Sequence, residues 1–311
     1  MRNPSARGAG GTATDTDAAT AVYAEHRHTL FAVVYDMLGS VADTEDVLQQ
    51  TWILWASAHR PEVISPRGYL LRIAVNEALG RLRSVRQSRE TYVGPWLPEP
   101  VITSEDPAAG SVLRTEAASF GMLLVLETLS PLERAVFVLR EAFDFDYGEI
   151  ADILQRSPAA VRQIARRARD HITTRRPRYK PDPALHRAVT ERFLSAALGG
   201  DIPELMKLLA PDVALWTDGG GKLRAALNVI VGSAKIARLV HARSGLIPAG
   251  VECHSVELNG GPAIVAIAGD RVYGVLIVEP DDSGERISRL YMQLNPEKLG
   301  AVRRAVTWSR R

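Results

Sequence analysis

The sequence lacks the features that point to a secreted, membrane-spanning or metal-binding protein. Its single cysteine, Cys253, excludes an internal disulfide and a cysteine-based zinc site, and makes a reducing cytoplasm the simplest expectation. It has no apolar run of the length, about 18 residues, that crosses a bilayer, so no membrane contact is expected. Residues 1–19 lack an apolar core, and we expect a disordered tail there rather than a signal peptide. Nothing in the sequence requires a metal or another cofactor.

The distribution of charge is more informative than the total. The 311 residues carry a net charge of +2 and are 46% hydrophobic, which predicts two or three globular domains. Between Arg156 and Lys180 there are nine Lys or Arg and one acid, Asp170, and Arg81 to Arg89 holds four Arg and no acid. One such run is usually a solvated helix face. Two runs on separate predicted helices favour a polyanionic partner.

Residues 20–93 have the apolar spacing of a helical domain. A first helix is predicted to end at Leu38, before Gly39. Asp43 is then expected to be the N-cap of a second helix, and a third helix is predicted from Pro66 to Arg89.

Residues 94–111 are predicted to be an extended linker, because Gly94–Pro100 contains three prolines in seven residues. In an undocked linker the apolar side chains of Trp96 and Leu97 would be exposed to water, so we expect both to dock on another part of the protein. An ordinary proline-rich connector is the alternative.

Residues 112–176 are predicted to form a second helical domain with a helix-turn-helix. A short helix over Tyr147–Gln155 precedes Ser157 and Pro158, which suit the N-cap and first position of a second helix. That helix is predicted to bury Val161, Ile164, Ala165 and Ala168 and to present Arg162, Gln163, Arg166, Arg167 and Arg169. Arg and Gln are the side chains that read guanine and adenine in the major groove. Upstream, Ser130 and Glu133 have the spacing of a capping box. A helical hairpin made soluble by arginines is the alternative.

Residues 184–311, after a basic linker at 177–183, change in character. One or two helices (184–198 and 201–210) are predicted first. The strands predicted after them are Val213–Trp216, Val251–Leu258, Ala263–Ile267, Arg271–Val278 and Ile287–Gln293. Helices followed by a meander of strands indicate an α+β domain with an antiparallel sheet.

Two motifs carry a family resemblance. Leu38–Trp52 resembles the polymerase-binding region of sigma domain 2, and Leu129–Arg134 with Tyr147–Arg169 resembles sigma domain 4. A chain with these two sigma domains alone resembles the extracytoplasmic-function sigma factors. The resemblance implies transcription initiation, with promoter DNA and the clamp helices and flap of the RNA polymerase core as partners. It implies no catalytic activity.

Three further motifs resemble signatures of one subgroup of that family. They are Trp96–Pro100, Asp218–Lys222 and Asn295–Leu299. Members of the subgroup carry a C-terminal extension similar to SnoaL and other NTF2-like cones. The resemblance therefore implies two all-α domains followed by an α+β cone. The implied divisions are a tail (1–19), sigma domain 2 (20–93), a linker (94–111), sigma domain 4 (112–176), a second linker (177–183) and the cone (184–311).

The resemblance also implies roles for individual residues. Contacts to the polymerase core are implied for Asp43, Glu45, Asp46, Gln49, Gln50 and Trp52. Contacts to the −10 promoter element are implied for Asn76, Arg81, Arg83 and Arg86. Relatives often carry Asn or Asp where this chain has Gly80, which puts a second base contact in doubt. Contacts to the −35 element are implied for Arg162, Gln163, Arg166 and Arg167.

We interpret the C-terminal domain as a built-in regulator, in which a glycine-rich loop contacts the linker or the two sigma domains and the last helix tunes polymerase engagement. Its expected contact residues are Trp96, Leu97, Pro98, Asp218, Gly219, Gly220, Gly221, Lys222, Asn295, Pro296, Lys298 and Leu299. A plain hairpin turn is the alternative for the glycine run. The free chain is expected to be a monomer.

Two other functions stay open on the residues alone. The cone could bind a small molecule or act as an enzyme, for which Asp218, His241, His254 and Asp270 are the acid–base candidates, although the sequence does not fix their geometry. A dimeric helix-turn-helix repressor is the second alternative. It would leave the acidic segment Asp43–Trp52 without a purpose.

Overall fold

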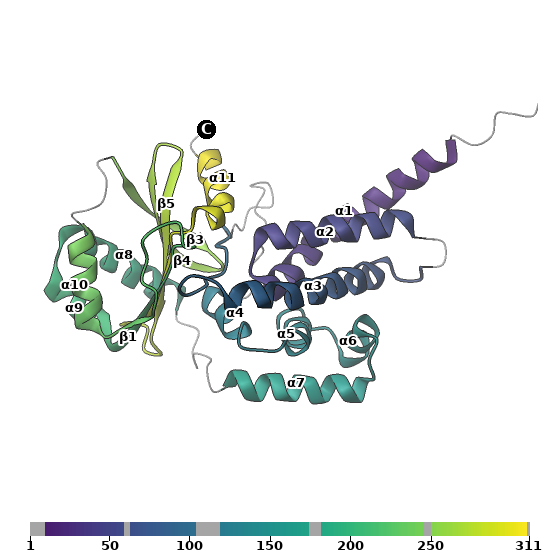
Figure 1. The fold of residues 1–311 in the computed structure, drawn as a ribbon, viewed down its shortest axis with the longest axis horizontal. Coiled ribbons are helices and arrows are strands. Elements are labelled where there is room, and N and C mark those ends of the chain that lie inside the picture. The colour runs from purple at the N-terminus through teal and green to yellow at the C-terminus, as the bar shows by residue number, and fades with distance from the viewer. Residues whose placement is uncertain (1–9, 59–62, 104–118, 174–181, 245–249, 310–311) are drawn as a thin grey trace, which may run out of the picture. The chain divides into compact units, whose positions relative to one another are not determined.

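A computed structural model describes residues 10–58, 63–103, 119–173, 182–244 and 250–309 of the chain (Figure 1). The chain divides into two compact units. Unit 1 comprises Met1–Leu38, Ala42–Arg83 and Ser130–Ala168. Unit 2 comprises Gly39–Val41, Ser84–Leu129 and Arg169–Arg311.

The first three helices are α1 (Gly10–Leu38), α2 (Val41–Ser57) and α3 (Pro66–Glu90). The predicted stop at Gly39 is confirmed, because α1 ends at Leu38 and Gly39 has φ +65°. The prediction that Asp43 is the N-cap of α2 is wrong. The helix already begins at Val41, so Asp43 lies inside its first turn, where a carboxylate still meets the positive end of the helix dipole.

The helix-turn-helix is confirmed in α6 (Tyr147–Leu154) and α7 (Pro158–Thr173). Gln155 ends α6 in the left-handed conformation, and the Ser157 hydroxyl accepts the Ala160 N–H at 3.2 Å to cap α7. Upstream, α5 (Pro131–Phe137) has the expected capping box of Ser130 and Glu133, and a π-helical turn, η3 (Val138–Ala142), extends it.

Unit 2 contains a six-stranded sheet with several helices. Its helices are α4 (Phe120–Leu126), α8 (Pro183–Gly199), α9 (Ile202–Leu208), α10 (Ser233–Ser244), the 3₁₀ turn η4 (Pro296–Lys298) and α11 (Gly300–Ser309). Its strands are β1 (Leu209–Asp218), β2 (Ile230–Val231), β3 (Glu252–Leu258), β4 (Gly261–Ala268), β5 (Arg271–Pro280) and β6 (Ile287–Gln293). The expected α+β class is confirmed.

The details of the sheet correct the prediction in two respects. The strand order is β2-β1-β6-β5-β4-β3, and the β1–β6 pair is parallel, so the sheet is mixed rather than wholly antiparallel. The helix predicted over 201–210 ends at Leu208, because Leu209 and Ala210 already belong to β1. Helix α10 and the short edge strand β2 were not predicted.

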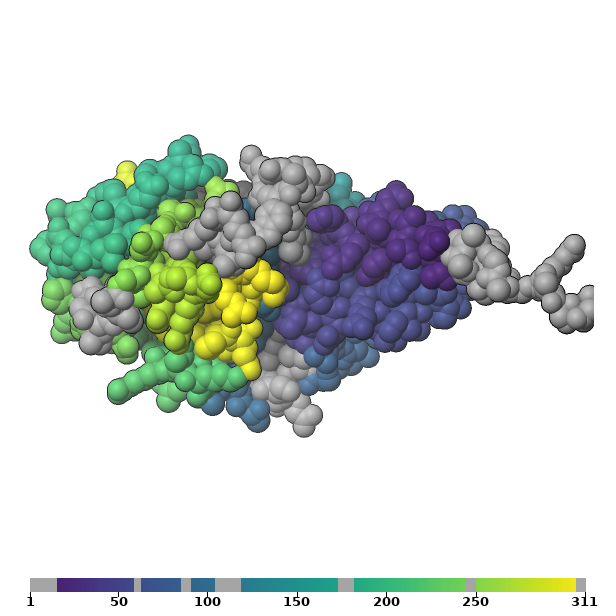
Figure 2. Space-filling view, turned by 90° about the horizontal axis from the view of Figure 1, so that it is seen from above, coloured from purple at the N-terminus to yellow at the C-terminus, as the bar shows by residue number. Residues whose placement is uncertain are grey.

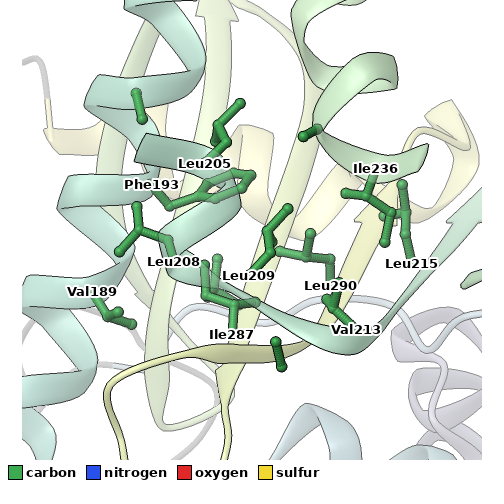
Figure 3. Close-up of a cluster of buried hydrophobic side chains, with 14 of the residues drawn as sticks. Val189, Phe193, Leu205, Leu208, Leu209, Val213, Leu215, Ile236, Ile287 and Leu290 are labelled. Carbon is green, nitrogen blue, oxygen red and sulfur yellow. The ribbon is translucent and has the colours of Figure 1, made fainter. Parts of the chain in front are cut away.

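Both faces of the sheet are apolar, and each has its own cover. On one face, α8, α9 and α10 close a core that includes Phe193, Leu205, Ile236 and Leu290 (Figure 3). The other face is covered by Leu97 of the linker, Phe120 of α4, and Leu299 and Val302 at the C-terminal end. The space-filling view shows α11, in yellow, against the yellow-green strands of the sheet (Figure 2).

A mostly buried carboxylate, Glu279 of β5, joins α4 to the sheet. It accepts the Gly121 N–H in the first turn of α4 and the Tyr291 hydroxyl, at 3.1 Å. Arg289 Nη1 lies 3.5 Å away. Burial raises the pKa of Glu279, opposed by the Arg289 charge and by these hydrogen bonds. A methyl group on Gly121 would overlap the Glu279 carboxylate, so a larger residue there would require this side chain to move.

We predict that Gly121→Ala lowers the free energy of unfolding of unit 2 by about 1 to 3 kcal/mol, because the added methyl group must displace Glu279 from its partners. Gly80→Ala is the control. Gly80 lies within α3 with nothing within 4 Å of its added methyl group, so this change should stabilise unit 1 by about 1 kcal/mol. Denaturant unfolding measures both. A Gly121→Ala protein as stable as the wild type would contradict the assigned contact.

Candidate nucleic-acid interface and linker clamp

The acidic face of α2 is engaged by cations of its own unit. Asp43 Oδ1 lies 2.8 Å from Arg81 Nε and 2.5 Å from its Nη2. Asp46 lies 3.5 Å from the same guanidinium, and Glu45 pairs with Arg27 of α1 at 2.7 Å. Gln49 and Gln50 are exposed. Trp52 is half-buried against Tyr23, with ring centroids 5.4 Å apart. The face is therefore accessible, but its carboxylates already have partners.

The residues expected at the −10 element lie on α3. Asn76 and Arg83 are exposed, whereas Arg81 holds Asp43 and Asp46. The side chain of Arg86 lies outside the described residues. The structure thus brings together a residue expected to meet DNA and two residues expected to meet the polymerase. These exposed pairs are worth at most about 1 kcal/mol each, so they can exchange for other partners.

Helix α7 has one buried and one exposed face. Val161, Ile164, Ala165 and Ala168 are buried, as predicted. Arg162, Gln163, Arg166 and Arg167 are all exposed and lie on the opposite face. The arrangement presents a row of guanidinium and amide donors on one helix, the geometry that fits a major groove.

The centre of unit 2 is a carboxylate with no exposure to solvent, Asp218, at the end of β1. Oδ2 accepts the Lys298 ammonium at 2.7 Å, the Leu97 N–H at 2.9 Å and the Gln293 side-chain amide at 3.4 Å. Oδ1 accepts the Tyr92 hydroxyl at 2.7 Å and the Gly220 N–H at 2.9 Å. The carboxylate therefore ties β1, β6 and the C-terminal segment to the linker. We call the set Tyr92, Trp96, Leu97, Asp218, Gln293 and Lys298 the linker clamp.

Lys298 contacts the linker by its charge as well as by hydrogen bonds. Its ammonium donates to the Leu97 carbonyl at 2.7 Å and lies 4.3 Å from the Trp96 ring centroid and 4.8 Å from that of Tyr92. Both contacts are within cation–π range. Burial, together with the bond to Asp218 and its charge, raises the pKa of Tyr92, so its hydroxyl stays a donor at neutral pH. The linker tryptophan and leucine do dock, as expected.

The glycine-rich loop fits closely around this clamp. Gly220 and Gly221 have φ of +62° and +70°, and a side chain on Gly220 would overlap Asn295. Gly219 is buried against the Leu223 carbonyl. Asn295 donates to Tyr92 at 3.0 Å and accepts the Glu297 N–H. Lys222 is exposed and pairs with Glu297, and Pro296 is exposed. Helix structure near Asn295–Leu299 is limited to η4, because the last helix, α11, starts at Gly300.

The linker also holds the connection between α1 and α2. The buried Glu99 accepts the Val41 N–H at 2.8 Å, and its own N–H donates to the Gly39 carbonyl at 2.8 Å. Trp96 and the buried Pro98 lie against Gly39, where a methyl group would be only 3.0 Å from the Trp96 ring. The positive φ and this contact both require glycine at the position.

The four acid–base candidates lie on different elements of unit 2. Asp218 is fully buried and accepts five hydrogen bonds within the linker clamp. His241, His254 and Asp270 are exposed on α10, β3 and the β4–β5 turn.

Sequence reasoning missed several residues of this site. Tyr92, Gln293, Glu99 and Glu279 all hold the linker or α4, and none was singled out. Glu99 lies inside the Trp96–Pro100 motif, so the motif itself was a signal for it. Gln293 and Glu279 lie on strands, where a polar residue normally indicates the solvent face.

Two family models match the helical parts of the chain. A Sigma-70 region 2 model matches residues 22–89, which run from within α1 to the last turn of α3. A Sigma-70 region 4 model matches residues 121–172, which covers α4 to α7. The fold and the motifs on α2 and α7 therefore agree with the two regions expected from the sequence.

Whole-chain relatives extend the match. The ECF RNA polymerase sigma factor SigJ of Mycobacterium tuberculosis is 39% identical over 221 residues, 69% of each chain. This chain belongs to the ECF RNA polymerase sigma factors. The probable ECF sigma factor SigI of the same species is 29% identical over 290 residues, 92% of this chain and 97% of SigI. The crystal structure of M. tuberculosis SigJ matches with a TM-score of 0.71 and 31% identity, covering 91% of this chain and 98% of that one.

This sigma factor shares its C-terminal α+β unit with the solved SigJ structure. The family to which it belongs is one of transcription initiation factors. Among the described residues, no helix has the length and apolar character needed to span a bilayer.

We predict that Asp218→Asn and Lys298→Met each lower the free energy of unfolding of unit 2 by about 3 to 5 kcal/mol, because each leaves a buried charge without its partner. In a double-mutant cycle the coupling energy should be about 1 to 3 kcal/mol. Lys222→Met with Glu297→Gln is the matched control. That pair is 50% and 67% exposed, so its coupling should stay below about 1 kcal/mol. Equal coupling energies in the two cycles would contradict the central role assigned to Asp218 in the linker clamp.

Proposed function

We propose that this sigma factor directs RNA polymerase core to promoters and that unit 2 restrains it by holding the interdomain linker. In this proposal the exposed face of α2 (Asp43, Glu45, Asp46, Gln49, Gln50 and Trp52) meets the polymerase clamp helices. Asn76 reads a base of the −10 element while Arg81, Arg83 and Arg86 follow its phosphates. The exposed residues of α7, namely Arg162, Gln163, Arg166 and Arg167, read the −35 element, and region 4 meets the flap.

The observation that carries the regulatory part is the burial of Asp218 by linker groups. A carboxylate removed from water is stable only while its donors stay in place. Two of those donors, Tyr92 and Leu97, belong to the segment between regions 2 and 4. A linker that is held along Tyr92–Thr103 has fewer residues free to span two promoter elements. Releasing the clamp should therefore raise initiation.

Release of the linker clamp and removal of the sheet should have opposite effects on transcription initiation. A chain that ends near Leu294 keeps β6 but loses Lys298, so the linker is freed while the sheet still supports α4. A chain that ends near Arg178 loses the sheet, and Phe120 and Gly121 of α4 lose the surface that they pack against. Because α4 belongs to region 4, we expect that shorter chain to initiate poorly.

Run-off transcription with purified polymerase core tests this proposal. Asp218→Asn and the chain ending near Leu294 should raise promoter-specific transcripts several-fold over the full chain, whereas the chain ending near Arg178 should lower them. Glu297→Gln, which breaks only the exposed pair with Lys222, is the control and should leave output unchanged. Unaltered output from Asp218→Asn would refute the regulatory role, and no specific initiation from any of the proteins would refute the sigma function itself.

If α7 reads the promoter, a neutral side chain should affect base discrimination and a charged one should affect the salt dependence of binding. Gln163→Ala should reduce discrimination at one −35 base pair by about 1 to 3 kcal/mol and leave the salt dependence of binding unchanged. Arg169→Ala should lower the slope of log affinity against log salt by about 1 and leave discrimination intact. Binding of holoenzyme to wild-type and single-substituted promoter fragments measures both. If the two variants behave alike, α7 does not read bases in this way.

A further inference from the structure

Unit 2 contains a segment whose charges all have one sign. From Gly219 to Val251 the sequence has no Asp or Glu, and its cations are Lys222, Arg224, Lys235, Arg238 and Arg243. The last three belong to α10, which holds no acidic residue at all. All three are exposed. Helix α10 lies on the sheet face opposite to α11, with Ile236 and Ala237 packed into the core (Figures 1 and 3).

The cations of α10 have no carboxylate partner among the residues that the structure describes. Lys235, Arg238 and Arg243 form no ion pair with any residue that the structure describes, and the Arg238 guanidinium bonds only to the Ala234 carbonyl of its own helix. Several other cations of the unit are paired with carboxylates. Arg187 pairs with Glu257, while Arg192 and Lys207 both pair with Glu204.

The carboxylates on the elements next to α10 do not neutralise it. Asp201 caps α9 by accepting the Glu204 N–H, and Glu204 is held by Arg192 and Lys207. Asp212 of β1 is exposed, close to the start of α10 because its neighbour Val213 accepts the Gly232 N–H. Asp201 and the exposed Glu191 of α8 keep their charges as well, but among the described residues no ion pair joins these carboxylates to α10, so the exposed face of α10 itself stays positive.

We propose that α10 is a further DNA contact of this sigma factor, in which Lys235, Arg238 and Arg243 bind backbone phosphates of duplex promoter DNA. The inference rests on the proposed function only in that the protein must be on a promoter. A helix of 12 residues is about 18 Å long, a length over which duplex DNA carries about ten phosphate charges. The contact would add affinity without reading sequence, because phosphates carry no base information.

The composition of the face favours DNA over an acidic protein. Protein interfaces depend on buried aromatic or aliphatic anchors surrounded by polar groups. On α10 the exposed positions beside the three cations and His241 are the alanines Ala234 and Ala242. The exposed aliphatic residues of this part of the chain, Leu223, Leu227, Val229 and Val231, precede the helix. A face of cations and small residues is suited to a phosphate backbone.

Salt dependence of binding tests the proposal. Full-length protein in complex with polymerase core is titrated onto labelled promoter duplexes at several salt concentrations, and fluorescence anisotropy gives the affinity. Replacing all three cations (K235Q/R238Q/R243Q) should weaken binding at low salt and reduce the slope of log affinity against log salt by about 2 to 3, close to one unit for each lost phosphate contact.

The matched control removes the same charge from the same unit at ion-paired positions, as R187Q/R192Q/K207Q, and should leave the slope unchanged. An unchanged slope in the α10 variant would overturn the proposal, as would an equal reduction in both variants, which would indicate a general field effect. Weaker binding to polymerase core with an unchanged DNA slope would assign the face to an acidic protein surface and also overturn it. Failure here leaves initiation and the Gln163 effect intact, so it is distinguishable from failure of the proposed function.

Discussion

The C-terminal unit is organised around the cost of burying the charge of Asp218. A carboxylate in a water-free site needs an opposite charge and several donors, and no single segment of this chain supplies them all. Lys298 comes from the C-terminal turn, Gln293 from β6, and Tyr92 and Leu97 from the linker. These segments can satisfy the carboxylate only together. Docking of the linker and the stability of unit 2 are therefore thermodynamically coupled.

The sheet imposes a second constraint of the same kind. The six-stranded sheet is apolar on both faces, and α8, α9 and α10 cover only one of these faces. The other face is covered by Leu97, Phe120, Leu299 and Val302, which come from the linker, the first helix of region 4 and the C-terminal end. Unit 2 therefore does not end where the sigma regions end. Helix α4 belongs both to the core of unit 2 and to the segment that matches region 4.

Local chemistry was predictable from sequence, and long-range polar contacts were not. The caps at Ser130 and Ser157 and the helix stop at Gly39 depend on neighbours within four residues, so they were predictable, although Gly39 also contacts the distant Trp96. Docking of Trp96 and Leu97 was inferable because apolar side chains need cover. Glu279 was not, because its position on the Val275 and Ile277 face of β5 is known only once the strand is registered and α4 lies on it. The parallel β1–β6 pair likewise depends on the whole sheet.

Arg81 shows how the proposed polymerase and DNA surfaces can depend on each other. In the free chain its guanidinium is shared between Asp43 and Asp46, two carboxylates of the face proposed for the polymerase. Arg81 is 43% exposed, so solvent screens these pairs and each is readily exchanged. A phosphate that attracts Arg81 would release both carboxylates, and a polymerase cation that attracts Asp43 would release Arg81. Under the proposed roles each event favours the other, and because such coupling is reciprocal, DNA would strengthen polymerase binding by the same factor as polymerase strengthens DNA binding.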